Sequence, residues 1–191
     1  MDDTGIGYNM PGMFVLEGAL HVKRFQVALD ALAQRHESLR TAFPQQDDQP
    51  VQQVLDDCSI PLEYTEHFDG EDREFIRRFI RPFDLTSAPL IRAGLLRVEA
   101  GDHLLLVDMH HIISDGISVT LLVQDLIRLY EGVEMEPLAV QYKDYCYWQT
   151  LDEAVRSRRT QETYWTGVFS DEVPVLNLPY DFPRPSVQRF E

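Results

Sequence analysis

The sequence predicts an α/β fold, because apolar segments of strand length alternate with segments of helical periodicity. Residues 90–98 and 103–109 are apolar and β-prone, and the four-residue loop 99–102 between them suits a hairpin connection. Residues 22–36 instead place apolar side chains at helical spacing. A chain of 191 residues that is 44% hydrophobic can bury a sizeable core, so we expect one α/β domain.

The first third of the chain predicts a strand, a helix and a hairpin. Residues 13–17 form a short apolar run between glycines, which predicts a strand covered on both faces. Residues 22–36 predict an amphipathic helix. Its apolar stripe consists of Phe25, Ala28, Leu29 and Leu32. Residues 39–55 predict a hairpin around the polar turn at 44–50.

The remaining elements follow from the same two periodicities. Residues 60–64 predict a strand, and 71–80 predict a helix with an apolar face that ends at Pro82. Pairing of the strands 90–98 and 103–109 brings Arg92 or Arg97 near the second of them. Residues 141–169 are helix-prone, with Tyr142, Tyr145 and Trp148 interpreted as helix-face packing rather than substrate contacts. The proline-rich end, residues 175–191, is interpreted as a linker.

Composition excludes several functions. The formal charge of -15 opposes nucleic acid or an anionic membrane as the main partner, since both require basic patches. Cys58 and Cys146 lie far apart without metal-ligand spacing, which favours two free thiols in a reducing cytosol. No apolar run approaches membrane-spanning length, and the first residues lack a signal pattern, so we expect a cytoplasmic protein.

Residues 109–116 concentrate polar chemistry where an apolar strand meets a helical pattern. They include His110, His111, Ser114, Asp115 and Gly116. Apolar residues recur at helical spacing after Gly116, so a helix is expected to begin there. Successive side chains of a strand point to opposite faces, so only one of His110 and His111 can face a given cavity. We expect one histidine to be chemical and the other structural.

The residues alone leave few interpretations of this corner. A metal site using both histidines and Asp115 conflicts with their divergence and with the lack of a further His or Cys nearby. A catalytic triad using Ser114 lacks the Gly-x-Ser-x-Gly turn, and Ser114 is too near in sequence to reach either ring easily. We reject both. The structural alternative is a pair of satisfied core histidines beside a helix cap.

The corner also resembles a known motif. Residues 110–116 match the His-His-x-x-x-Asp-Gly motif of condensation domains in nonribosomal peptide synthetases, a superfamily that includes chloramphenicol acetyltransferase. Residues 35–43, 142–149 and 178–185 resemble further stretches of the family and fall in the family's order. Cys146 and Tyr147 depart from the usual pattern, away from the catalytic motif.

The resemblance covers the whole chain and implies its organisation. It implies a chloramphenicol acetyltransferase-like lobe with a mixed β-sheet packed with helices. Residues 1–191 would be the N-terminal lobe of a condensation domain, with 175–191 as the linker toward a C-terminal lobe. The opening motif of the family and the later motifs of the second lobe are missing from this chain. We therefore expect the chain alone to be inactive.

The resemblance further implies an activity and its partners. An aminoacyl or peptidyl thioester on an upstream carrier domain would be attacked by the amine of an aminoacyl thioester on a downstream carrier. The enzyme would be an amide-forming acyltransferase that binds no cofactor of its own. The phosphopantetheine arms would belong to separate carrier domains, beside an adenylation domain.

The resemblance assigns roles to the residues at the corner. His111 would be either the general base or a positioner of the amine, while His110 is structural. Asp115 would pair with an arginine, for which Arg40 is the candidate within this chain and an arginine of the other lobe is the alternative. The backbone N–H of Gly116, at a helix start, would donate to the developing oxyanion.

Two other functions share parts of this pattern. An epimerization domain carries the same motif, although the run from Ser114 to Ser118 looks more like condensation. A noncatalytic carrier-docking or recruitment module is the other alternative. Such relatives often lose the second histidine, and this chain keeps His111.

Overall fold

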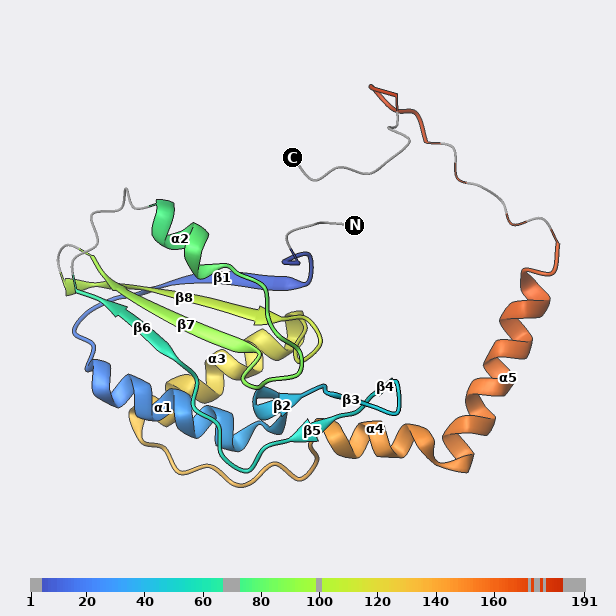
Figure 1. The fold of residues 1–191 in the computed structure, drawn as a ribbon, viewed down its shortest axis with the longest axis horizontal. Helices are drawn as coiled ribbons and strands as arrows, with labels where there is room; N and C mark the ends of the chain where they lie inside the picture. The colour runs from blue at the N-terminus through green and yellow to red at the C-terminus, as the bar shows by residue number, and fades with distance from the viewer. Residues whose placement is uncertain are drawn as a thin grey trace. The chain divides into compact units, whose positions relative to one another are not determined.

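The computed structural model describes residues 5–66, 73–98, 101–171, 173, 176 and 178–183. The chain divides into two compact units, Met1–Lys143 and Asp144–Glu191. The first unit is a β-sheet with helices on both faces, and the second contains the long helix α5 (Asp152–Val168) (Figure 1). This arrangement confirms the predicted α/β class.

A mixed four-stranded sheet forms the centre of the first unit. Its strands lie in the order β1-β8-β7-β6, with β1 and β8 and also β7 and β8 antiparallel, and β6 and β7 parallel. Their bounds are Asn9–Leu16 (β1), Leu62–Thr65 (β6), Ile91–Arg97 (β7) and His103–His110 (β8). The predicted hairpin is confirmed by the pairing of β7 with β8. Part of its loop, residues 99–100, lies outside the described residues.

Helices cover the two faces of this sheet unequally. Helices α1 (Val22–Arg35) and α3 (Gly116–Glu131) pack together on one face over the larger core (Figure 1). The predicted stripe of α1 is buried, and all of it except Ala28 belongs to this core. On the other face, Phe75 and Phe79 of the short helix α2 (Arg73–Phe79) pack against Leu96 and Leu106. Gly94 allows this helix to pack closely on the sheet, because a Cβ at this position would lie 3.0 Å from the Phe79 ring.

Strand β1 differs from the expectation in extent and in burial. It begins at Asn9 rather than near residue 13, because its register with β8 runs through Pro11 and Gly12, which have poor strand propensity. Met13 and Val15 are each 62% exposed, so the expected cover on both faces is wrong. Because β1 lies at the edge of the sheet and alternates its side chains, only one face of it contacts the core.

The predicted hairpin over residues 39–55 is confirmed. A 3-10 helix (Glu37–Arg40) leads into β2 (Thr41–Ala42), which pairs with β5 (Gln53–Val54). The short strands β3 (Gln45–Gln46) and β4 (Gln49–Pro50) continue the ladder. Asp47 and Asp48 form its turn with φ of 50° and 58°, a conformation that aspartate tolerates better than most residues.

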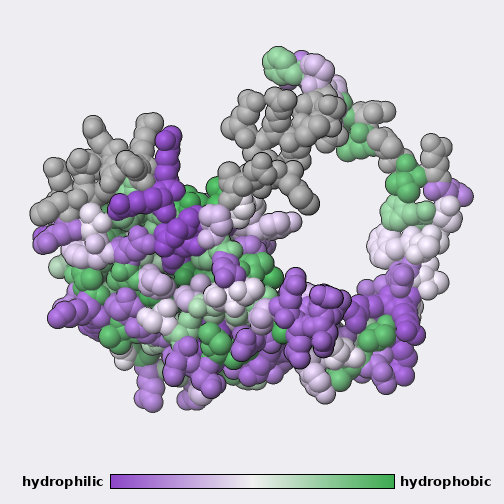
Figure 2. Space-filling model, in the orientation of Figure 1, coloured by the Kyte–Doolittle hydropathy of each residue, from purple (hydrophilic) through white to green (hydrophobic). Residues whose placement is uncertain are grey.

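The predicted C-terminal helices are also confirmed. Helix α4 (Tyr142–Thr150) starts at the end of the first unit, and α5 follows it in the second. Aromatic side chains at the end of α5 contact one another, Tyr164 with Trp165 and Trp165 with the C-cap residue Phe169, and remain exposed. Apolar residues interrupt the hydrophilic surface of both units (Figure 2). The interpretation of residues 175–191 as a linker falls largely outside the described residues.

Candidate functional site

The end of β8 and the segments beside it fix the backbone of His110 and of His111, the residue that follows the strand. The N–H of His110 donates to the carbonyl of Leu90 at 2.9 Å, and the N–H of His111 donates to that of Tyr8 at 2.8 Å. The corner is thus held by the chain on both sides of the strand. Its backbone position follows from sheet pairing, which local sequence does not encode.

The two imidazoles lie in different surroundings, although only His110 belongs to β8 and His111 lies in the turn after it. The His110 ring lies half-buried between Tyr8 and Phe83, with centroid distances of 6.0 and 6.3 Å, and its Nδ1 accepts from the N–H of Ile112 at 3.1 Å. Burial, and then the neighbouring His111, lower the pKa of His110, which favours its neutral form. His111 is exposed instead and lines a cavity. His110 therefore packs, and His111 is available for chemistry.

The cavity beside His111 has a volume of about 370 Å³ and is formed by three parts of the first unit. The corner itself contributes most of the wall, the 3-10 helix contributes Ser38, and the start of α4 contributes Tyr142. The complete lining is Ser38, His111, Ile112, Ile113, Ser114, Asp115, Ser118 and Tyr142. Ser114 Oγ lies 3.5 Å from the carbonyl oxygen of His110, to which it donates, a contact unlike that of a triad nucleophile.

Asp115 is the N-cap of α3 rather than half of a buried ion pair. Its Oδ1 accepts from the N–H of Ser118 at 2.8 Å and from the Ser118 hydroxyl at 2.7 Å. These hydrogen bonds lower the pKa of Asp115, and the carboxylate is exposed. The cap satisfies a backbone donor that every helix start leaves without a partner.

The expected pairing of Arg40 with Asp115 is wrong for this structure. Arg40 donates to the carbonyl of Leu55, and its guanidinium lies 3.5 Å from the Glu37 carboxylate. Both partners are close to Arg40 in sequence, so the 3-10 helix and the hairpin hold it locally. Arg40 is therefore a residue of the hairpin base and does not line the cavity of His111.

Asp115→Ala should lower the Tm of the chain, because the first turn of α3 loses its acceptor, whereas Asp115→Ser should recover part of the loss. A carboxylate whose folded pKa is depressed contributes stability above its unfolded pKa, and this contribution disappears as the pH falls through the folded pKa. Calorimetry at neutral and acidic pH should therefore show the difference from the wild type shrinking in acid. An Asp115→Ala variant as stable as the wild type at neutral pH would contradict the capping role.

Gly116 is the first residue of α3, where the backbone N–H has no acceptor within the helix. A Cβ at this position would meet no atom within 4 Å, so the space around the glycine is open. The positive end of the helix dipole lies at the same turn, and it favours developing negative charge. The Asp115 carboxylate already lies at this turn, and Gly116 itself does not belong to the cavity wall.

Tyr142 was expected to pack on a helix face, but it lines the cavity, as does Ser38, which sequence reasoning also missed. Two neighbours fix Tyr142 there. Gln141 Nε2 donates to the carbonyl of Arg35 at 2.9 Å, and Lys143 Nζ donates to Glu37 Oε1 at 2.7 Å. A signal exists in the sequence, because residues 35–43 and 142–149 both resemble stretches of one family, but their contact with each other is not visible there.

A second set of contacts joins the C-terminal end of α1 to α3. Arg35 Nε donates to Asp125 Oδ2 at 2.8 Å, and His36 Nε2 lies 2.8 Å from that oxygen. Burial opposes ionisation of Asp125, but the hydrogen bonds and charges of Arg35 and His36 outweigh it and lower its pKa. The helix that begins at Gly116 is thereby anchored to the segment that carries Ser38.

A buried polar cluster lies on β8 two residues before His110. Asp108 is 0% exposed, and its Oδ2 accepts from Asn9 Nδ2 at 2.8 Å and lies 3.4 Å from Arg92 Nη1. Burial raises the pKa of Asp108, and this effect outweighs the lowering by Asn9 and Arg92. The expectation that the hairpin brings an arginine to the motif strand is confirmed for Arg92.

Arg92 also binds the segment that leads from α2 to β7. It donates to the carbonyls of Phe79 at 3.0 Å, Arg81 at 2.8 Å and Pro82 at 3.3 Å. Its guanidinium carbon lies 3.7 Å from the centroid of the Phe83 ring, which in turn contacts His110 edge-on. One buried arginine therefore supports the packing around His110.

Among the described residues, no group of three or more His, Cys, Asp or Glu is arranged to hold a metal ion. Cys58 and Cys146 are free thiols, and burial raises the pKa of Cys58. No helix in the described part of the chain is long and apolar enough to cross a membrane.

Comparison with known proteins agrees with the geometry of the corner. The family model described as "Condensation domain" matches residues 1–191. The chain belongs to the condensation domain family. The resemblance inferred from residues 110–116 is thereby confirmed, and with it the chloramphenicol acetyltransferase-like α/β fold that condensation domains share.

Curated relatives of this condensation-family chain are peptide synthetases. It is 46% identical over 189 residues to "Tyrocidine synthase 3" of Brevibacillus parabrevis, a match that covers 99% of the chain and 3% of that protein. It is 45% identical over 191 residues to "Bacitracin synthase 2" of Bacillus licheniformis, a match that covers 100% of the chain and 7% of that protein. The chain thus spans a small part of the proteins that it matches.

Solved structures share the fold. The condensation-family chain superimposes on the X-domain in the "Complex of the X-domain and OxyB from Teicoplanin Biosynthesis" with a TM-score of 0.82 and 28% identity. This match covers 97% of the chain and 43% of the X-domain chain. The "First condensation domain of the calcium-dependent antibiotic synthetase" shares the fold, with a TM-score of 0.69 at 22% identity.

Proposed function

We propose that this chain is the N-terminal lobe of a condensation domain that forms amide bonds in nonribosomal peptide synthesis. The observation that carries the proposal is the exposed imidazole of His111 on a cavity of about 370 Å³, beside the N-terminus of α3. Membership of the condensation family supports the reaction class. The substrates would be a donor aminoacyl or peptidyl thioester and the amine of an acceptor aminoacyl thioester.

The proposed reaction requires one bond to form and one to break. The acceptor amine attacks the thioester carbonyl carbon, and the carbonyl electron pair moves to oxygen. The N–H of Gly116 would donate to this oxyanion. Collapse breaks the C–S bond and releases the donor thiol. The proton lost by the amine would pass through the imidazole of His111 to the sulfur.

His111 has two roles open to it, and their magnitudes differ. General-base assistance typically contributes about 10²- to 10⁴-fold in rate. Bringing two tethered reactants into line can contribute about 7–11 kcal/mol by itself. His111 can therefore serve as base, as positioner of the amine, or as both.

The proposed partners follow from the reaction. Donor and acceptor would arrive on the phosphopantetheine arms of separate upstream and downstream carrier domains, next to an adenylation domain, in the cytoplasm. The chain covers 43% of the X-domain chain that it matches, which leaves room for a second lobe in such proteins. We propose that a C-terminal lobe closes the cavity of His111 and that residues 175–191 lead toward it.

A condensation assay with loaded donor and acceptor carriers tests the proposal. A complete two-lobe domain containing this chain should form the amide product, whereas the 191-residue chain should not, because one wall of the site is missing. Addition of a separately expressed second lobe should restore turnover. Turnover by the chain alone at the rate of the complete domain would overturn the two-lobe assignment, and no turnover by the complete domain with several acceptors would overturn the reaction.

A recruitment module is the second candidate function, and the X-domain match favours it. That X-domain was solved in a complex with OxyB, and its TM-score to this chain is 0.82. Retention of an exposed His111 on a cavity favours catalysis instead. A complete domain that binds loaded carriers without forming product would identify the recruitment function.

A further inference from the structure

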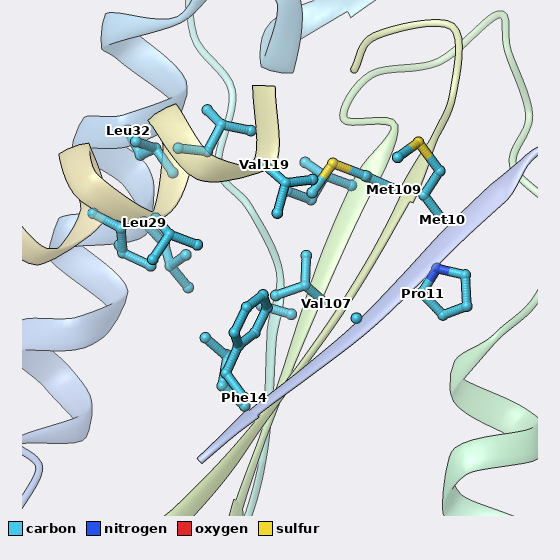
Figure 3. A pocket seen from close by; sticks show the side chains of 15 residues that line it. Met10, Pro11, Phe14, Leu29, Leu32, Val107, Met109 and Val119 are labelled. Carbon is cyan, nitrogen blue, oxygen red and sulfur yellow. The ribbon is translucent and has the colours of Figure 1, made fainter. Parts of the chain in front are cut away.

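A second cavity lies inside the first unit, between the sheet and the two helices that cover its larger core (Figure 3). Its volume is about 160 Å³. The strands β1, β7 and β8 form one wall, and α1 and α3 form the other. Figure 3 shows Met10, Phe14 and Val107 on the strand side, with Leu29 on α1 and Val119 on α3 facing them.

Every side chain that lines this cavity is apolar. The backbone of the three strands is paired within the sheet, so the strand walls offer few free polar groups. A buried water needs two to four polar partners and would not find them here. Such a space is therefore suited to an apolar molecule and not to water or an ion.

The size of the cavity defines what it can hold. Protein interiors are packed as densely as organic crystals, and voids much larger than a water are few. Apolar cavities of about 150 Å³ bind benzene or xenon, and this one has about 160 Å³. Two thioethers, those of Met10 and Met109, belong to its wall and can adapt to a guest (Figure 3).

The residues that line the cavity differ in their exposure to solvent. Leu29, Ala93 and Leu105 are buried at its base. Met10 and Gly12 are only half-buried, and they lie on β1 at the edge of the sheet. The side of the cavity at the edge strand is therefore nearer to solvent than its base.

We propose that this cavity is a binding site for a small, uncharged apolar molecule of about the size of benzene. The guest contacts β8, which ends at His110, and α3, which starts at Gly116. It therefore lies against both elements that position the candidate active site. The inference concerns a different cavity from that of His111 and is independent of the proposed function.

Benzene, titrated into the 191-residue chain, is the probe. It should raise the Tm saturably and shift the methyl NMR signals of Met10 and Met109, because both methionines line the cavity. Val119→Phe should abolish both responses, since the larger side chain occupies the space. The matched control is Val27→Phe on α1, where Val27 is 67% exposed and outside the cavity, and it should respond like the wild type.

The NMR titration of the wild type keeps the test decisive if Val119→Phe fails to fold. Methionine signals that do not move at saturating benzene would overturn the proposal, as would a Val119→Phe variant that responds as fully as the wild type. Neither result depends on condensation activity, so failure here leaves the proposed function untouched.

Discussion

Replacing His111 with alanine in a complete two-lobe domain should reduce amide formation by about 10²- to 10⁴-fold while leaving the Tm close to that of the wild type. The ring is exposed on the cavity and is not part of the buried core, so its loss removes little packing. Single-turnover measurements with both carriers saturating would isolate the chemical step from carrier binding.

Two further variants distinguish the possible roles of the two histidines. His111→Gln keeps a hydrogen-bonding group but cannot take up a proton, so a rate near that of the wild type would assign positioning and a rate near that of alanine would assign base catalysis. His110→Ala should act mainly through stability, because it removes a half-buried ring between Tyr8 and Phe83. Wild-type turnover by His111→Ala would contradict the catalytic assignment.

Arg92→Met should lower the free energy of unfolding by about 3–5 kcal/mol, the usual cost of removing one member of a buried ion pair. Arg92 is 6% exposed, and its loss removes the cation beside Asp108 and one donor to each of the carbonyls of Phe79, Arg81 and Pro82. Denaturant unfolding of the 191-residue chain measures the difference. A loss below about 1 kcal/mol would place the pair among weak surface contacts.

Asp108→Asn is the matched change in the partner, and it should cost much less. The amide oxygen that this substitution introduces can still accept from Asn9, and Arg92 keeps its three carbonyl acceptors. The double variant Arg92→Met, Asp108→Asn should be more stable than Arg92→Met alone, because no unpaired charge is left in the core. Equal stability of those two variants would show that the carbonyl contacts, and not Asp108, account for the loss.

The pH dependence of unfolding offers an independent check on Asp108. Its folded pKa is raised, so the folded chain binds more protons than the unfolded chain between the unfolded and folded pKa values. The contribution of Asp108 to stability therefore falls as the pH rises through that window and stays low above it. Asp108→Asn should remove this part of the pH profile, and an unchanged profile would contradict the shift.

The sequence predicted elements whose evidence is local. The apolar stripe of α1 and the apolar runs of β7 and β8 were sufficient because each signal lies within its own segment. The true start of β1 was not predictable in this way. Asn9, Pro11 and Gly12 are poor strand formers, and only pairing with β8 makes that segment a strand.

The candidate site also contains residues that local sequence predicts and residues that it does not. Neighbouring residues determine the different surroundings of His110 and His111 and the cap at Asp115. A helix cap at this position is one of the alternatives that the sequence leaves open. The Arg40 pairing came from resemblance, and local partners of Arg40 replaced it. Tyr142 reaches the cavity through contacts of Gln141 and Lys143 with residues more than a hundred positions away, which no periodicity reveals.

Within the described residues, strand β1 pairs on one side only, with β8, and its exposed face carries Met13 and Val15. An apolar strand at a sheet edge can accept a strand from another molecule and so start aggregation. Pro11 interrupts the row of backbone donors on β1, and the net charge of -15 makes copies of the chain repel one another. Salt weakens this repulsion without changing the strand, so the colloidal stability of the chain should depend on ionic strength even where its folding does not.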